Sequence, residues 1–466
     1  MSNSLWTPLR RMTLIGVVLL EVLVAFEQIA VATAMPTAAR ELHGLAIYPV
    51  VFAVPLATAV LAMVVAGPWA DSAGPRVVVL TGVSLFVAGL LIAGSAQSMV
   101  MLIVGRSVQS VGGGLDSVAL YVLIAMAFPD TLRPKIFMSI SAAWVAPSLF
   151  GPPLAGYLAT QLTWRWVFWI GATLAVPALA LLLPAMRRLP AVVRTQDPAA
   201  RVRRRLVAAV AAALGSVALS VAADRSLLPA LVLAVVGMVL LVASVPRLVP
   251  AGTIRGQRGM PAVIATRALL GAAFLGTDIY LPLMLTRQHG MDATEAGLVL
   301  TVGALSWSFG AWVAGRRSSY EDQRRLARTG LVLLTIGIGI ALSAAWPATP
   351  SWILYGAWLI GGGGIGLAYS PLTVLLMGLS TPEEQGRNAS SLQTAEMLTT
   401  SVLLAVSAIV FGGFTPHSQT LAFVSGLALS GLAAMLGIVV SHRLRPDRTA
   451  GRRAAVGAGS VACSGD

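Results

Sequence analysis

Gly67-Pro-Trp-Ala-Asp-Ser-Ala-Gly-Pro-Arg76 is a short charged segment between two apolar stretches, each of which is long enough to cross a lipid bilayer. The segment contains a carboxylate, a guanidinium and two glycines, and it is too short to fold on its own. A carboxylate and a guanidinium held at a membrane face between two helices indicate a moving part of the molecule.

The amino-acid composition predicts that lipid is the solvent of this chain. Of the 466 residues, 57% are hydrophobic and only 11% are charged, and the mean hydropathy is +0.84. A soluble protein of this composition would have almost no hydrated surface. Fourteen apolar runs approach the length of about 20 residues that a membrane-spanning helix needs, and they lack the alternation of a barrel strand. We therefore expect an all-α membrane protein with fourteen transmembrane helices.

The order of runs and charges divides the chain into four parts. We expect six-helix bundles over residues 1–186 and 259–441, basic linkers with an inserted two-helix hairpin over 187–258, and a disordered tail over 442–466. The hairpin is rich in Ala, Val and Leu and predicts lipid-facing packing without chemistry. Glycines and prolines inside the spans of both bundles predict close packing and bending.

The basic residues predict the orientation in the membrane. Counted against the runs, 26 of the 32 Lys and Arg residues fall on one side, and Lys and Arg are retained on the cytoplasmic side during insertion. We expect both termini in the cytoplasm and the chain in the cell (inner) membrane as a monomer. The net charge of +14 follows from this asymmetry, so membrane lipids with anionic headgroups, and no nucleic acid, are the expected counter-charge.

Nothing in the sequence indicates an enzyme, a metal site or a cofactor. The single cysteine, Cys463, excludes an internal disulfide, and the four histidines show no ligand spacing. Phosphate-binding loops, zinc-protease motifs and serine-hydrolase motifs are absent from the sequence. Energy would therefore come from an ion gradient or from downhill flux of the cargo.

Several ionisable residues fall inside apolar spans, where they are costly and often functional. The acidic residues are Glu21, Glu27, Asp116, Asp278 and Glu396. Burial favours the neutral form of a carboxyl, so each is a candidate to bind protons or a cation. The alternative for each is a structural, hydrogen-bonded carboxyl or an ion pair with Arg106 or Arg267. Arg106 lies about seven residues inside its span and needs an acceptor from a neighbouring helix, whereas Arg267 is close enough to a span end to snorkel.

Aromatic side chains are the other candidate ligand surface. Trp144, Tyr280, Trp307 and Tyr369 lie within spans and could line a cavity that accepts flat or cationic compounds, although packing is the better explanation for any one of them. Trp164 lies near a span end, where an interfacial aromatic belt accounts for it.

Several motifs in order resemble the major facilitator superfamily, and within it the fourteen-span drug:proton antiporters. The matching residues are Gly67, Asp71, Gly74 and Arg76 between spans two and three; Arg106, Gln109, Gly112 and Gly114 in span four; Pro147, Gly151, Pro152 and Gly156 in the antiporter motif of span five; Trp164-Arg-Trp-Val-Phe168; and Glu27-Gln-Ile-Ala-Val-Ala-Thr-Ala-Met-Pro36. The loop motif departs from the family pattern at Trp69 and Ser72. The corresponding loop of the second half, residues 316–328, lacks its aspartate and glycines.

The resemblance implies a role for each motif. Asp71 and Arg76 would latch a cytoplasmic gate, Arg106 would take part in proton coupling, and the span-five motif would bend. The family's geometry would also bring Glu27, Asp116 and Asp278 to one central cavity.

The expected function is proton-coupled efflux of small hydrophobic or cationic molecules by alternating access. An exporter of a specific endogenous metabolite, siderophore or lipid is the main alternative. A receptor or scaffold that has lost transport is a third possibility, against which the retained Arg106 and antiporter motif argue.

Overall fold

A computed structural model describes residues 7–43, 50–188, 199–222, 227–291, 293–317, 319–381, 384–414 and 417–445. In this part of the chain every regular element is helical, which confirms the expected all-α class. The helices are α1 (Pro8–Glu41), α2 (Val50–Ala73), α3 (Pro75–Gly94), α4 (Met99–Ala127), α5 (Arg133–Ala142), α6 (Val145–Tyr157), the π-helix η2 (Leu158–Leu162), α7 (Arg165–Arg187), α8 (Ala199–Ala222), α9 (Leu227–Leu248), α10 (Met260–Asp278), α11 (Tyr280–His289), α12 (Ala293–Gly315), α13 (Tyr320–Ser343), α14 (Trp352–Leu379), α15 (Gln385–Phe414) and α16 (Gln419–Ser441).

Eleven helices of the described ranges are long and apolar enough to cross a membrane. The pair α10–α11 counts as one of them, and α1, α5, α6 and α8 are not among them. The chain is thus a multi-pass membrane protein, whereas the number of fourteen spans stays a prediction.

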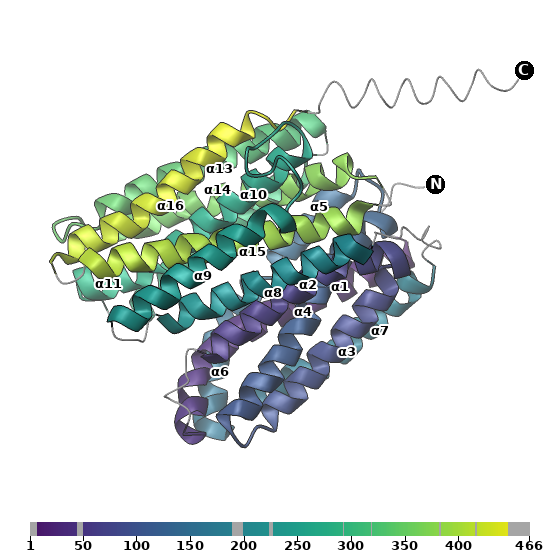
Figure 1. Cartoon of the computed structure of the whole chain (residues 1–466), viewed down its shortest axis with the longest axis horizontal. Helices are drawn as coiled ribbons and strands as arrows, with labels where there is room; N and C mark the ends of the chain where they lie inside the picture. Colours follow the sequence, from purple (N-terminus) through teal and green to yellow (C-terminus); the bar gives the residue numbers. More distant parts are fainter. Residues whose placement is uncertain are drawn as a thin grey trace, which may run out of the picture.

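The helices pack in two groups that meet at one end (Figure 1). Helices α1–α7 contact one another, as do α10–α16. The groups touch through α2 and α4 against α15, through α5 against α12 and α14, and through α6 against α12. Away from these contacts the groups diverge towards α6 and α11. We call the end that carries the Gly67–Arg76 segment the motif end; the contacts between the groups gather there.

Glycines set the position of α4 within the first group. A Cβ on Gly105 would lie 2.5 Å from the backbone nitrogen of Ala93 in α3, and a Cβ on Gly114 would lie 2.6 Å from the carbonyl oxygen of Ala59 in α2. In lipid, such close backbone approach replaces the hydrophobic effect as the force that joins helices. The rotation of α4, and hence the direction of its polar side chains, follows from these contacts.

The inserted hairpin α8–α9 lies against both groups at once. Its helices contact α2 on one side and α15 on the other. The buried cluster between them is apolar and consists of Val60, Val64, Ala208, Ala209, Ala212, Leu241, Leu248 and Leu398. Many outward side chains of the hairpin, such as Val207 and Leu231, are exposed. The hairpin therefore exposes apolar side chains on one face and has a packed face that bridges the two groups, whereas its contact with lipid stays a prediction.

Two apolar stretches are interrupted where proline removes a helical hydrogen bond. Pro282 has no N–H for the carbonyl of Asp278, four residues earlier, and the chain changes there from α10 to α11. The span-five region is divided into α5, α6 and η2, with the first break at Ala143 and Trp144. Pro147, Gly151, Pro152 and Gly156 all fall in α6, beside that break. Broken helices of this kind are common around binding sites in transport proteins.

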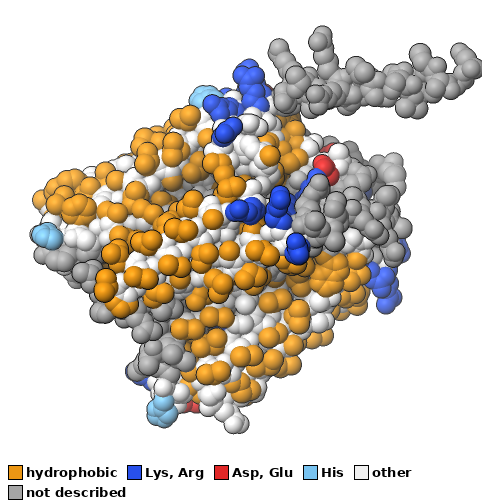
Figure 2. Space-filling view, in the orientation of Figure 1, with side chains coloured by type: hydrophobic (Ala, Val, Ile, Leu, Met, Phe, Trp, Pro, Cys, Tyr) orange, Lys and Arg blue, Asp and Glu red, His pale blue; other side chains and the backbone are white. Residues whose placement is uncertain are grey.

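Side chains of different type occupy different parts of the surface. Figure 2 shows apolar side chains over most of the visible face and basic side chains gathered towards the motif end. This distribution is typical of a membrane protein, with apolar side chains against hydrocarbon and basic side chains at an end that faces water.

Candidate functional site

Glu27 is the centre of a buried polar cluster in the first group. Its side chain is 2% exposed, and its Oε2 accepts a hydrogen bond of 2.8 Å from Nε2 of Gln109 in α4. Nη1 of Arg106, one turn earlier in α4, lies 3.9 Å from the same oxygen. Oε1 has no hydrogen-bond partner, and it faces Gly171 of α7, where a Cβ would come within 2.9 Å. The ionised carboxylate is only partly compensated, so a change of its charge alters the balance of the cluster.

Asp116 has different neighbours. It is 6% exposed, lies against Gly82 of α3, and its Oδ1 has no hydrogen-bond partner. Glu21 of α1 is near enough to interact with it electrostatically, and the side chain of Trp144 lies within hydrogen-bonding reach of Glu21. Asp116 therefore sits between two helices of one group.

Asp278 lies at the α10–α11 break beside a set of stacked aromatic rings. Its Oδ1 accepts a hydrogen bond of 2.9 Å from the indole of Trp358 in α14. The ring of Trp358 stacks on Phe274 at 4.9 Å, and Phe274 meets Trp307 edge-on at 5.1 Å. Trp307 in turn contacts Tyr369 at 5.3 Å. A carboxylate beside aromatic faces has the chemistry to hold an organic cation.

Glu396 is paired with Arg267 nearer the motif end. The Nε–Oε2 distance is 3.2 Å, and the arginine side chain is 0% exposed. Arg267 therefore does not snorkel, although its distance from the span end allowed that reading. Helices α14 and α15 cover it, and the guanidinium lies over the ring of Tyr369 at 3.1 Å.

The acidic candidates thus occupy separate surroundings. Glu27 contacts α4 and α7, Asp116 contacts α3, and Asp278 contacts α14; none of the three touches another within the described residues. The structure does not place them in one cluster, because the glycine contacts of α4 turn Asp116 towards α3.

Asp71 joins the two groups at the motif end. Its carboxylate, 8% exposed, accepts hydrogen bonds of 2.8 Å from the backbone N–H groups of Gly386 and Arg387. These are the first turn of α15, where unpaired N–H groups and the helix dipole favour an anion. Ser390 of α15 also donates to the carbonyl of Met63 in α2. The carboxylate is therefore a cap supplied by one group to a helix of the other.

The glycines of the same segment permit this contact, whereas its arginine takes no part in it. A Cβ on Gly67 would lie 2.6 Å from Cβ of Ser390, so only glycine lets α2 and α15 approach. Gly74 has φ of 86°, which glycine adopts freely, and turns the chain from α2 into α3. Arg76 is exposed and makes no ion pair or hydrogen bond within the ranges described above.

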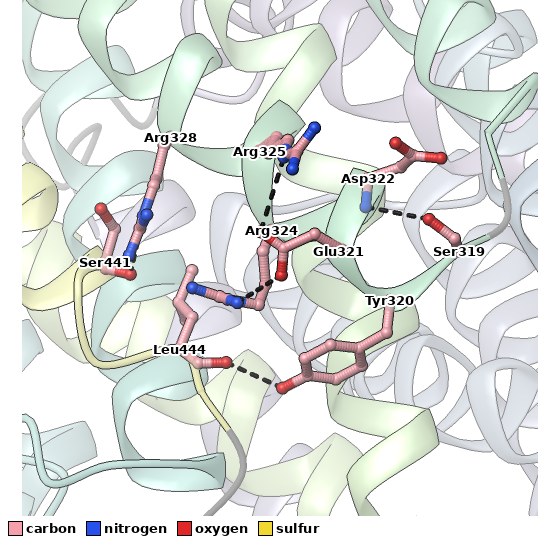
Figure 3. A network of polar contacts seen from close by, with 9 residues as sticks. All are labelled: Ser319, Tyr320, Glu321, Asp322, Arg324, Arg325, Arg328, Ser441 and Leu444. Atoms are coloured by element: carbon pink, nitrogen blue, oxygen red, sulfur yellow. Dashed lines mark hydrogen bonds and ion pairs between the residues drawn. The ribbon is translucent and has the colours of Figure 1, made fainter.

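The corresponding loop of the second group forms contacts inside its own group (Figure 3). The Tyr320 hydroxyl donates to the carbonyl of Leu444 at 2.8 Å, and Nε of Arg328 donates to the carbonyl of Ser441 at 3.2 Å. Ser319 caps the first turn of α13, and Glu321 pairs with Arg324 and Arg325. The start of α13 is thereby fastened to the end of α16, and the capping carboxylate of Asp71 has no counterpart there.

Comparison with known proteins identifies the family. The family model described as Major Facilitator Superfamily matches residues 17–402. The chain belongs to this superfamily. Among curated proteins, an uncharacterized MFS-type transporter of Mycobacterium tuberculosis is 28% identical over 438 residues, 91% of this chain and 63% of the relative. The chain thus spans less than two thirds of the length of that relative.

Other superfamily members carry more specific names. A probable multidrug-efflux transporter of M. tuberculosis is 24% identical over 88% of this chain and 89% of its own. The multidrug transporter protein MdtP of Bacillus subtilis is 29% identical, but over only 36% of this chain and 31% of its own. Among solved structures, a human organic anion transporter matches with a TM-score of 0.67 at 13% identity, covering 92% of this chain and 99% of that one. The superfamily fold points to a transporter rather than an enzyme.

The remaining candidates of this superfamily member are spread over the structure. Trp307 and Tyr369 belong to the aromatic set beside Asp278, whereas Tyr280 accepts a hydrogen bond from Ser407 and stacks on Phe411 at 5.0 Å, in a packed region. Trp144 precedes α6 and lies near Glu21.

Two residues of these clusters had not been singled out from the sequence. Trp358 precedes the Gly361–Gly364 run by three positions. Tyr121, which lies beside the Arg267 guanidinium, follows Asp116 by five positions in a span already rich in motif residues. The sequence shows that both residues are aromatic and where they stand in the chain, but it does not show which residues they contact.

The Trp164–Phe168 segment, one of the motifs that resemble the superfamily, forms hydrogen bonds at the end of the first group opposite the motif end. Glu41, at the end of α1, accepts hydrogen bonds from the Trp164 indole at 2.8 Å and from Arg165 at 2.6 Å. Arg165 also donates to the carbonyl of Ala96 in the α3–α4 turn. Trp164 is 1% exposed and therefore is not a residue of the interfacial belt. The Glu41 carboxylate thus joins the end of α1 to the start of α7, and Arg165 extends the contact to the α3–α4 turn.

Replacing Glu41 with glutamine is expected to destabilise the protein at neutral pH, and less so in acid. Hydrogen bonding from Arg165 lowers the pKa of Glu41, so the ionised form stabilises the fold above the usual carboxyl range and loses this effect as pH falls through the lowered value. We expect a loss of about 1 kcal/mol at pH 7, since the Glu41 side chain is half-exposed, and a smaller loss as the pH falls.

Thermal unfolding in detergent micelles between pH 3 and 7 measures this difference. Asp130→Asn is the matched control, because Asp130 is 82% exposed and pairs with Arg133, three residues away. A Glu41→Gln deficit that persists unchanged at pH 3 would contradict the proposed electrostatic origin.

Proposed function

We propose that this superfamily member is a proton-coupled antiporter that exports amphipathic or cationic small molecules by alternating access. The observation that carries the proposal is the Glu27 cluster: a buried carboxylate with one hydrogen-bonded oxygen and one free oxygen, beside Gln109 and Arg106. Such a group is neutral or ionised according to its surroundings, and that is what coupling a proton to a conformational change requires.

The orientation in the proposal rests on charge. Basic side chains gather at the motif end, which we assign to the cytoplasm together with both termini. Because the contacts between the groups lie at that end, the structure then corresponds to a carrier closed to the cytoplasm. Protons from outside would reach Glu27 or Asp278 in this state.

The proposed transport cycle follows from the protonation states of Glu27 in the first group of helices and Asp278 in the second. A cationic cargo is held by ionised Asp278 and the faces of Phe274 and Trp307. Protonation of Asp278 or Glu27 removes the negative charge, weakens this attraction and releases the cargo outside. Asp71 then leaves the end of α15, the α6 segment bends, and the protonated carrier opens to the cytoplasm. Asp116 and Glu396 remain further candidates for protons or cation.

The class of cargo is supported by one relative named as a multidrug transporter and another named as a probable multidrug-efflux transporter. Export of one endogenous metabolite, siderophore or lipid uses the same machinery and differs only in breadth. Growth-inhibition profiles of a deletion strain, set against the accumulation of metabolites in it, separate the two. The protein is proposed to act as a monomer in the cell (inner) membrane.

Transport into proteoliposomes after a pH jump tests the mechanism. With a fluorescent lipophilic cation as probe, Glu27→Gln and Asp278→Asn are each expected to reduce proton-driven flux at least about tenfold, one factor of ten being about 1.4 kcal/mol. Asp130→Asn, an exposed carboxylate outside every cluster described, serves as the control. Unchanged coupled flux in both variants would refute the assignment of protons to these residues.

A further inference from the structure

The Arg267–Glu396 pair lies where the two groups of helices meet, farther along α15 from the motif end than the Asp71 contact. Arg267 is on α10 and Glu396 on α15, both in the second group. Tyr121 of α4, in the first group, lies beside the guanidinium. Arg267 is therefore in contact with both groups while fully buried.

Arg267 is held tightly on the side of its own group. Its Nη1 donates to Oγ1 of Thr373 at 2.5 Å and to the carbonyl of Tyr369 at 3.2 Å. The ring of Tyr369 lies under the guanidinium, and Glu396 supplies the only carboxylate paired with it among the described residues. Gly271, one turn along α10, has no side chain and leaves the space that the Glu396 carboxylate occupies.

The first group completes the surroundings through aromatic packing. Tyr121 packs edge-on against Phe137 of α5 at 5.1 Å, and the carbonyl of Phe137 accepts a hydrogen bond of 3.4 Å from Ser370 of α14. Gln393, three residues before Glu396 on α15, donates to the carbonyl of Ser117 at 3.5 Å. A ring of contacts between the groups thus surrounds the buried charge.

Helix α15 connects this ring of contacts to the Asp71 contact. Gly386, which binds Asp71, and Glu396 are ten residues apart on the same helix, a rise of roughly 15 Å. A movement that takes α15 away from α4 and α2 therefore also takes its first turn away from Asp71.

We propose that Arg267 and Glu396 form an inner gate, in which the intact ion pair holds the motif end closed and protonation of Glu396 drives it open. The inference rests on alternating access as proposed above. With Glu396 neutral, Arg267 becomes a buried cation without a counter-charge, which is strongly unfavourable in a dry interior. Separation of α4 from α10 and α15 admits water and relieves this cost. The groups that face Glu396 are Arg267, Tyr369 and Tyr121, so no second carboxylate of the described chain compensates.

The single variant of Glu396 and the double variant of Arg267 and Glu396 are expected to differ in how often the motif end is open. Glu396→Gln leaves Arg267 uncompensated and is expected to raise the ratio of open to closed motif ends roughly 100-fold. The double variant Arg267→Met, Glu396→Gln removes both charges and is expected to close again, because apolar replacement of a whole buried pair is tolerated. Tyr121→Phe retains the pair and is expected to shift the ratio little.

Distances between spin labels measure the opening. Labels on cysteines at Lys135 and Thr381, both exposed, report the motif end; labels at Gln97 and Ala348 report the other end; Cys463→Ser supplies the background. Motif-end distances in Glu396→Gln that equal those of the parent, or equal behaviour of the single and double variants, would overturn the proposal.

A second measurement does not depend on the folding of any variant with a single substitution. Titration of the parent from pH 8 to pH 5 is expected to lengthen the motif-end distance, and the same titration of the double variant is expected to show less change. Equal responses overturn the inner gate. Because the readout is a distance and not flux, a failure of coupled transport with this response intact would count against the proposed function alone.

Discussion

Replacing Asp71 with asparagine is expected to open the motif end and to abolish most coupled transport. The carboxylate accepts two backbone hydrogen bonds at the positive end of α15, whereas the amide can accept only one and turns its NH2 towards the other N–H. Loss of a charge-assisted bond costs ~1.5–3 kcal/mol, and loss of the anion at the helix end ~0.3–1 kcal/mol. The closed state is therefore expected to weaken by about 2–4 kcal/mol, a factor of roughly 30 to 1,000.

Spin-label distances at Lys135 and Thr381 and flux in proteoliposomes both measure this change. Arg76→Gln is the discriminating control: family resemblance assigns Arg76 to the same latch, but its side chain is exposed and lies outside the contact. We expect Arg76→Gln to stay within about 0.5 kcal/mol of the parent, as exposed substitutions commonly do. Comparable effects of the two substitutions would show that the Asp71 cap is not the latch.

Replacing Arg106 with glutamine is expected to remove proton coupling while cargo binding persists. The guanidinium is 13% exposed and lies 3.9 Å from Glu27, so its removal leaves the carboxylate with Gln109 as its one polar partner. Removing one member of a buried pair typically costs ~3–5 kcal/mol, and a buried Glu27 that has lost this partner favours the protonated form. Proton-driven flux is expected to fall at least about 100-fold, equivalent to ~2.8 kcal/mol.

A double-mutant cycle separates this effect from general damage. Arg106→Gln and Glu27→Gln combined should be no worse than either alone, with a coupling energy of about 1–3 kcal/mol. Arg106→Lys is not expected to restore flux, because an ammonium cannot replace the planar guanidinium. Additive losses would indicate that the two residues act independently, and cargo binding measured by fluorescence in detergent provides the check on folding.

Local patterns in the sequence were sufficient to predict the helical class and to single out several residues that make contacts between helices. Asp71 and Gly67 were recognised from a ten-residue segment, and Asp71, for which the family resemblance implies a latch, contacts the first turn of α15. The clustering of Arg106 with Gln109 and Glu27 could be anticipated in part, since an arginine inside a span must meet an acceptor from another helix.

Partners that belong to different helices could not be predicted in the same way. Arg267 was equally compatible with snorkelling, and only the packing of α14 and α15 over it shows a fully buried cation. Asp116 turns towards α3 because glycine contacts set the rotation of α4. Trp164 meets Glu41 across more than a hundred residues.

The sequence by itself determined that this protein is a helical, multi-pass membrane protein with acidic groups at membrane depth and a charged turn at one face. Those properties follow from hydropathy and charge along a local stretch, which need no partner to be evaluated. Only the tertiary structure decided which helix each buried polar group faces, that Asp71 caps α15 while Arg76 stays outside, and that Arg267 bridges the two groups. The physical reason is that the rotation and separation of packed helices depend on contacts between residues far apart in the chain, such as Gly67 with Ser390, whose matching no single segment contains.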